Sequence, residues 1–173
     1  MKFLCQSSKL QRGIGVVEKA VSSRTTLPVL ENIFFEVKGK NLILRGNDLE
    51  VGIEFVMPVD DVSAEGKVLV KAKTISSIVS KLQNQSLDFQ ASEDGKVVIR
   101  AGRVDYNLLG MKVDEYPEFP SVESGLKVVL KVGELKELIK HTIFAVSFDE
   151  TKQFLNGILV KSEQERCRIK SRP

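Results

Sequence analysis

The stretch LPVLENIFFEV, residues 27–37, has a close counterpart later in the chain, the segment QFLNGILVKS at residues 153–162. Shifting the sequence on itself by 125 positions, without gaps, aligns the two segments together with the apolar residues that precede them. The aligned pairs include Leu4 with Val129, Leu10 with Leu135, Ile14 with Ile139, Ala20 with Ala145, Leu30 with Leu155 and Ile33 with Ile158. A single ungapped offset that holds over about 40 residues predicts a duplicated structural module.

The composition is typical of a soluble globular protein. Of the 173 residues, 42% are hydrophobic and 28% are charged, and no apolar run approaches the ~20 residues that a membrane-spanning helix requires. The N-terminal segment MKFLCQSSKLQRG has an apolar patch well below the ~7–15 residues of a secretory signal. We therefore expect a cytoplasmic protein that does not bind membranes. Cys5 and Cys167 are expected to be reduced structural thiols.

Hydrophobic periodicity predicts both helices and strands. Residues 9–21, 73–83 and 133–146 have apolar residues at the spacing of an amphipathic helix. Segments such as VGIEFVMPV, residues 51–59, alternate with a period of two, which is typical of antiparallel strands. SEDGK contains a hairpin turn in which Gly95 supplies a positive φ. These patterns predict an α+β fold with antiparallel sheets and two helices in the first part of the chain.

A change in composition predicts where this first part ends. Residues 113–125, VDEYPEFPSVESG, contain two prolines and four acids and show no periodicity, which indicates a linker. We expect a first domain at residues 1–115, a linker at 116–125 and a truncated second copy of the domain at 126–173.

Few residues could support catalysis. The single histidine, His141, is expected on the solvent side of the third helix. Asp48, Glu50 and Glu54 could hold a metal ion only if they converged, and a solvated strand face is the simpler interpretation. No glycine-rich phosphate-binding loop with a lysine is present. We predict a protein without catalytic residues, metal or cofactor, and keep a metal-dependent hydrolase or nuclease as an alternative.

The solvent-facing sides of the first two predicted helices carry positive charge. Arg12 and Lys19 lie opposite the apolar stripe of the first helix, and Lys73 and Lys81 lie outside on the second. Residues 66–87 contain four lysines and no acid, so the positive field is local. Such faces can bind phosphates without reading bases, but they are also typical of ordinary solvated helices. Periodicity leaves both interpretations open.

Five motifs resemble the family of the bacterial DNA polymerase III beta subunit, the sliding clamp. They are MKF at the start, RTTLPVLENI from Arg24, GNDLEVGI from Gly46, EYPEFP from Glu115 and FAVSFDETKQFLNGILV from Phe144. They follow the order and spacing of the family over residues 1 to about 165. The resemblance implies the DNA-clamp, or processivity, fold, whose domain is repeated along the chain and accounts for the two related stretches.

The resemblance also implies a function and a set of roles. It implies a non-catalytic processivity factor that forms a ring of two subunits around double-stranded DNA and is bound by DNA polymerase III and the clamp loader. The residues expected to face DNA are Arg24, Lys73, Arg12, Lys19, Lys81 and Lys152. Leu155 is expected in the wall of the pocket that captures partner peptides. Thr74, Ile75 and Ile78 are expected at the subunit interface.

The sequence departs from the family pattern after GILV, residues 157–160. IKSRP, residues 169–173, stands where the family has an Asp-Gly motif, and the remaining domains are not in this sequence. We therefore expect an N-terminal fragment that binds DNA weakly, does not close a homodimer ring and does not raise processivity. The alternative function is a clamp-fold interaction module that binds a protein partner without encircling DNA.

Overall fold

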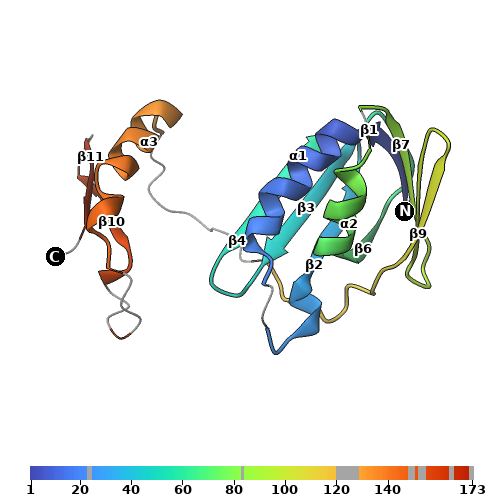
Figure 1. The fold of residues 1–173 in the computed structure, drawn as a ribbon, viewed down its shortest axis with the longest axis horizontal. Helices are drawn as coiled ribbons and strands as arrows, with labels where there is room; N and C mark the ends of the chain where they lie inside the picture. The colour runs from blue at the N-terminus through green and yellow to red at the C-terminus, as the bar shows by residue number, and fades with distance from the viewer. Residues whose placement is uncertain are drawn as a thin grey trace. The chain divides into compact units, whose positions relative to one another are not determined.

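The computed structural model describes residues 1–22, 25–82, 84–119, 129–147, 151, 155–163 and 166–171. The chain divides into two compact units, Met1–Ser121 and Val122–Pro173, called here unit 1 and unit 2. The division falls inside the segment that the sequence predicts as a linker. Figure 1 labels the elements of each unit. In the described part of the chain, no helix is both long enough and apolar enough to cross a membrane.

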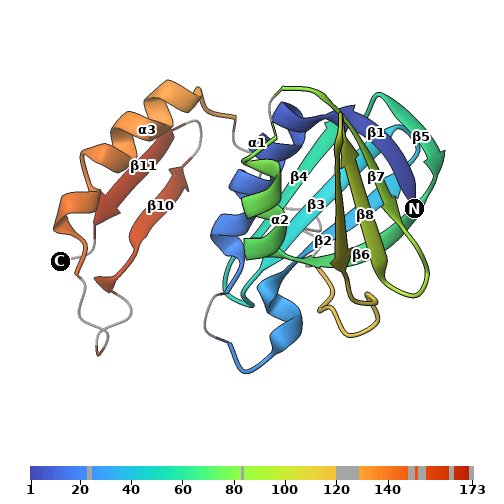
Figure 2. The same cartoon turned by 45° about the vertical axis from the view of Figure 1, so that its right-hand side comes forward.

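Unit 1 contains two antiparallel sheets and two α-helices, which confirms the predicted α+β class. One sheet has the strand order β5-β1-β7-β8-β9 and the other has the order β4-β3-β2-β6, as can be followed in Figure 2. The strands are β1 Lys2–Gln6, β2 Asn32–Lys38, β3 Asn41–Asn47, β4 Gly52–Pro58, β5 Asp61–Ala64, β6 Gly66–Lys71, β7 Ser86–Ala91, β8 Lys96–Ala101 and β9 Val104–Leu109. The helices are α1 Ser7–Val17 and α2 Ala72–Val79, with 3-10 turns η1 Glu18–Ala20 and η2 Pro28–Glu31.

Unit 1 is built from two halves with the same order of elements. The first half is β1-α1-β2-β3-β4 and the second is β6-α2-β7-β8-β9. In each half a helix begins directly after the first strand, and three antiparallel strands follow it. The first strand of each half pairs with the other half, β1 with β7 and β6 with β2. The two halves are therefore joined by exchanged strands as well as by a common core.

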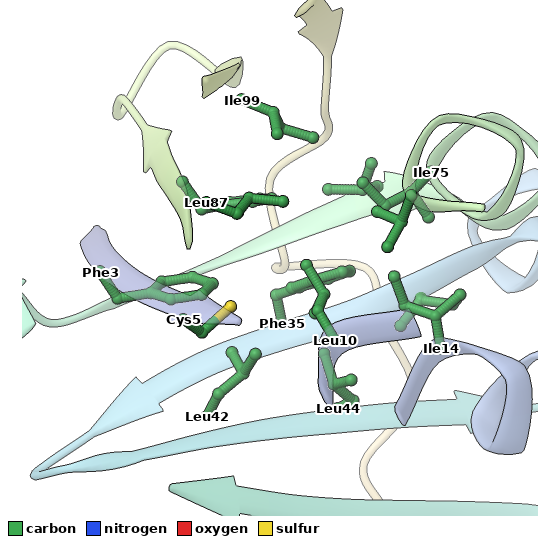
Figure 3. Packing of buried hydrophobic residues seen from close by; sticks show 14 of the residues in the cluster. Phe3, Cys5, Leu10, Ile14, Phe35, Leu42, Leu44, Ile75, Leu87 and Ile99 are labelled. Carbon is green, nitrogen blue, oxygen red and sulfur yellow. The ribbon is translucent and has the colours of Figure 1, made fainter. Parts of the chain in front are cut away.

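The core fills the space between the two sheets and the inner faces of α1 and α2 (Figure 3). At its centre the ring of Phe89 lies 5.0 Å from Phe3 and 5.3 Å from Phe35, measured between ring centroids. Leu10 and Ile14 of α1 point into the same cluster and are almost completely buried. Burying each such side chain contributes roughly 1.5–3 kcal/mol to stability, so this cluster is the main reason why the halves stay together.

The ends of the two helices differ from the predicted ends. α1 begins at Ser7 instead of residue 9 and ends at Val17, where η1 replaces the last predicted turn. The start is set by Gln85, since its backbone oxygen accepts from Ser7 N (3.0 Å) and its backbone nitrogen donates to Ser7 Oγ (3.2 Å). α2 spans Ala72–Val79 instead of 73–83. Periodicity within a helix carries no information about such distant partners.

Two glycines allow α1 to lie close to the four-stranded sheet. A Cβ atom on Gly46 of β3 would lie 2.2 Å from the backbone oxygen of Val17, and one on Gly13 would lie 2.8 Å from Cδ1 of Leu44. A Cβ on Gly15, in contrast, would meet nothing within 4 Å. Gly46 is therefore required by its close approach to the backbone, Gly13 leaves room for the Leu44 side chain, and Gly15 is not needed for packing. The hairpin glycine Gly95 has φ +86°, as predicted.

Aromatic residues after position 115 belong to unit 1. The ring of Tyr116 lies 5.4 Å from that of Phe34, and its hydroxyl group donates to the backbone oxygen of Arg45 (3.5 Å). The guanidinium group of Arg45 lies 5.2 Å from the Phe34 ring and 5.5 Å from the Phe119 ring. Val113 packs on the same cluster. The expected boundary at 115 thus lies too early, because periodicity does not detect a segment held by single aromatic side chains.

Unit 2 contains two helical segments and a hairpin: α3 Val132–Lys140, η3 Ile143–Ala145, β10 Ile158–Glu163 and β11 Arg166–Ser171. The third predicted helix is therefore split into α3 and η3. The shift of 125 residues that aligns the sequences carries η1 onto η3. It also carries the pairing of Phe34 with Arg45, between β2 and β3, onto the pairing of Leu159 with Lys170, between β10 and β11.

Candidate nucleic-acid interface

α1 and α2 lie side by side on unit 1 (Figures 1 and 2). Each helix buries its apolar stripe in the core, as shown by Ile14 in α1 and Val79 in α2. α2 is joined to η1, the turn that follows α1, where Ser76 Oγ donates a hydrogen bond of 2.8 Å to Glu18 Oε2. Because both helices turn the opposite side to solvent, their polar residues form one surface with those of η1 and of residues 80–82 after α2, called here the helix surface.

The helix surface carries the four cations that the sequence predicts for it, and they are Arg12, Lys19, Lys73 and Lys81. All four are exposed. None of the four forms an ion pair with another described residue. By comparison, Lys67 on the four-stranded sheet lies 3.1 Å from Glu36. The charges of the helix surface are therefore available to an external anion.

A cavity of about 250 Å³, with a mixed polar and apolar lining, adjoins the start of α2 and was not predicted from the sequence. Its lining consists of Glu18, Val21, Ser22, Glu31, Lys71, Ala72 and Lys73. Lys71 Nζ lies 3.2 Å from Glu31 Oε2, so this lysine is already neutralised by an internal partner. The cavity depends on the approach of η2 to α2, and no motif in either segment signals that approach.

Two of the predicted DNA-facing residues, Arg24 and Lys152, lie outside the described residues, and their roles stay predictions. Leu155, predicted for the peptide pocket, is half-buried in unit 2, and its backbone oxygen accepts from Ser147 N (3.1 Å). The structure therefore brings together four of the six predicted cations, Arg12, Lys19, Lys73 and Lys81.

The three residues predicted for a subunit interface differ in accessibility. Thr74 is exposed and Ile78 is partly buried on α2. Ile75 is 0% exposed in the core of unit 1, so its side chain cannot also contact another subunit in this structure. Periodicity places Ile75 on the apolar stripe and so predicts its burial. The structure agrees with this prediction and not with the interface position that the resemblance implies for this residue.

The acids that could have formed a metal site have structural roles. The Asp48 carboxylate accepts from the backbone nitrogens of Glu50 (3.0 Å) and Val51 (2.7 Å), and these bonds lower its pKa. Glu54 Oε2 lies 2.7 Å from Nε of Arg45. Among the described residues, no three His, Cys, Asp or Glu side chains are grouped to hold a metal ion. Asp48 thus closes a turn, and Glu54 anchors a strand pair.

The remaining reactive side chains are poorly placed for chemistry. Cys5 is buried in the core, and burial raises its pKa to about 12, so the thiol stays neutral and unreactive near neutral pH. His141 is exposed and follows the last turn of α3. Among the described residues of unit 1, the helix surface therefore stands out because it groups several cations that have no ion-pair partner.

Comparison with known proteins connects this geometry to a family. The family model for the DNA polymerase III beta subunit, N-terminal domain, matches residues 1–120. The beta sliding clamp of Bacillus subtilis (strain 168) is 34% identical over 171 residues, which cover 95% of this chain and 45% of the relative. The beta sliding clamp of Synechocystis is also 34% identical over 171 residues, covering 93% of this chain and 43% of the relative.

Solved structures agree with the sequence relatives. The crystal structure of the Bacillus subtilis sliding clamp has a TM-score of 0.87 at 33% identity and covers 95% of this chain and 45% of that chain. The beta subunit from Streptococcus pyogenes has a TM-score of 0.87 at 28% identity, over 94% of this chain and 44% of that chain. This chain thus spans about half the length of the relatives that it matches. From the match to residues 1–120 and these likenesses, the chain belongs to the DNA polymerase III beta subunit family, the beta sliding clamps.

Proposed function

We propose that this chain serves DNA replication as the N-terminal part of a sliding clamp, a non-catalytic protein that keeps the replicative polymerase on its template. The observation that carries the proposal is the helix surface, in which two adjacent helices present Arg12, Lys19, Lys73 and Lys81 without internal ion-pair partners among the described residues. Membership of the sliding clamp family supports the same function.

The helix surface suits a partner whose charge is regular and whose sequence varies. Duplex DNA presents phosphates at the same spacing whatever its bases, so lysine and arginine side chains can bind any stretch of it equally. Long side chains that end in single cations also allow one phosphate to be exchanged for the next. Such contacts hold a protein near the duplex without fixing its position along it, as a clamp that moves with a polymerase requires.

The partners of this chain are proposed from the family and from the accessible residues. Arg24 and Lys152 would add cations to the DNA-facing set, and Leu155 would contribute to a pocket for peptides of DNA polymerase III and the clamp loader. Thr74 and Ile78, which are accessible on α2, would contact another subunit where a ring forms. The protein is proposed to act in the cytoplasm, where such a complex would meet DNA.

A matched pair of lysine variants tests the proposed DNA contact. Lys73→Gln removes an unpaired charge of the helix surface, whereas Lys67→Gln removes a lysine that pairs with Glu36 on the four-stranded sheet. We expect Lys73→Gln to weaken binding to short fluorescent duplexes of every sequence, measured by anisotropy, and to lower the slope of log affinity against log salt by about 0.9.

The matched control is expected to retain wild-type affinity and salt dependence. Equal losses in Lys73→Gln and Lys67→Gln would mean that the protein binds DNA by overall charge alone. Binding that depends on the base sequence, or that persists at high salt, would also contradict the proposal, because phosphate contacts predict neither.

A further inference from the structure

The helix surface contains one acid among its cations. Residues 7–20 and 72–82, which form α1, η1, α2 and the turn after α2, include five basic residues but only one acidic residue, Glu18. A carboxylate on a surface that faces phosphates repels them, so it lowers the affinity for DNA instead of raising it. The position of Glu18 therefore bears on how tightly this surface holds a duplex.

Glu18 is held at the junction between the two helices. It is the first residue of η1, and its Oε2 accepts the 2.8 Å hydrogen bond from Ser76 Oγ of α2. The residue is partly buried, so its carboxylate is more restricted than that of a fully exposed glutamate. Because the serine hydroxyl group is neutral, this hydrogen bond fixes the carboxylate in place without cancelling its charge.

The same carboxylate lies near a cation of the helix surface without pairing with it. Glu18 and Lys73 both line the cavity at the start of α2, yet neither forms an ion pair with another described residue. The other acid of the cavity, Glu31, differs because its carboxylate lies 3.2 Å from Nζ of Lys71. The charge of Glu18 is thus not neutralised by a described partner, and its field acts on any anion that approaches Lys73.

We propose that Glu18 limits the affinity of the helix surface for DNA and so allows the protein to move along a duplex. This inference rests on the proposed function, since it requires that the helix surface face phosphates. The cations attract the duplex, while the fixed carboxylate repels the phosphate that Lys73 attracts. Each phosphate contact is therefore weaker and is exchanged faster for the next one, as movement along DNA requires.

Glu18→Gln tests the inference, because glutamine removes the charge and its amide oxygen still accepts the hydrogen bond from Ser76. We expect this variant to bind short fluorescent duplexes about threefold more tightly at low salt, measured by anisotropy. The gain should shrink as salt is added, because ions screen the carboxylate. Glu93→Gln removes the same charge from an exposed position in the turn between β7 and β8. This matched control is expected to bind DNA as the wild type does.

Glu18→Ala separates the charge from the contact between the helices. Alanine removes both the charge and the hydrogen bond, so equal gains in Glu18→Ala and Glu18→Gln would support a role of the charge. A gain in Glu18→Ala alone, or an equal gain in Glu93→Gln, would overturn the proposal. If Glu18→Gln binds as the wild type does while Lys73→Gln binds more weakly, this inference fails and the proposed function stands. If Lys73→Gln also binds as the wild type does, the proposed function fails with it.

Discussion

At the scale of single residues, Gly46 allows α1 to lie close to β3. Because a Cβ there would lie 2.2 Å from the backbone oxygen of Val17, Gly46→Ala must displace either α1 or β3. We expect this variant to lower the free energy of unfolding by about 2–3 kcal/mol, measured by urea denaturation followed by circular dichroism.

Gly15→Ala is the matched control for this prediction. A Cβ on Gly15 would meet nothing within 4 Å, and alanine is a better helix former than glycine. The control is therefore expected to raise the free energy of unfolding by about 0.5–1 kcal/mol. If both substitutions shift stability in the same direction, close packing at Gly46 is not what holds α1 in place.

The buried Cys5 and the partly buried Tyr116 predict how stability responds to alkaline pH. Burial raises the pKa of Cys5 from 9.0 to about 12 and that of Tyr116 from 10.0 to about 12. The folded-state values are the higher ones, so stability is fully retained below about pH 9 and falls as the pH rises toward 12, where the unfolded chain loses protons that the folded chain keeps. The urea midpoint should therefore decrease over this range, and less steeply in Cys5→Ala. An unchanged slope in that variant would contradict burial of the thiol.

At the scale of elements, periodicity predicts the existence of the helices but not their limits or the pairing of strands. The apolar stripes of residues 9–21 and 73–83 correctly indicate α1 and α2, because burial of one helix face repeats in the sequence. The start of α1 depends on Gln85, a partner 78 residues away, and no local pattern records it. Likewise, no local pattern shows that β1 and β6 each pair with the opposite half of unit 1.

The segment that closes unit 1 gives a prediction at this scale. The Tyr116 ring packs against Phe34, and its hydroxyl group donates a hydrogen bond to the backbone oxygen of Arg45, so Tyr116→Ala is expected to lower the free energy of unfolding by about 1–3 kcal/mol. It should also speed tryptic cleavage at Lys112, since residues 113–119 lose their main contact with the sheet. Glu118→Ala, an exposed position in the same segment, should change neither the urea midpoint nor the cleavage rate. Cleavage at equal rates in the two variants would show that residues 113–119 are held by other contacts.

At the scale of the whole molecule, the candidate site could be predicted only in part. Helix periodicity places Arg12, Lys19, Lys73 and Lys81 on solvent-facing sides, and the structure adds that α1 and α2 are neighbours, which unites these cations on one surface. The position of α1 beside α2 could not be predicted from periodicity, because it depends on how the two halves of unit 1 exchange strands. For Ile75 the sequence pattern was sufficient. Its place on the apolar stripe of the helix predicts burial, and the side chain is buried.

The unequal cores of the two units lead to a prediction for the chain as a whole. Every buried hydrophobic residue among those described, from Phe3 to Ala101, belongs to unit 1, and α3 has none. Slow hydrogen exchange requires a packed core that resists local opening, so the amides of β2, β3 and β7 should exchange slowly at any protein concentration. Those of α3 should exchange quickly, because α3 has no buried residue. Mass-spectrometric exchange measures both rates, and protection of α3 equal to that of β3 would contradict the exposure of its apolar residues.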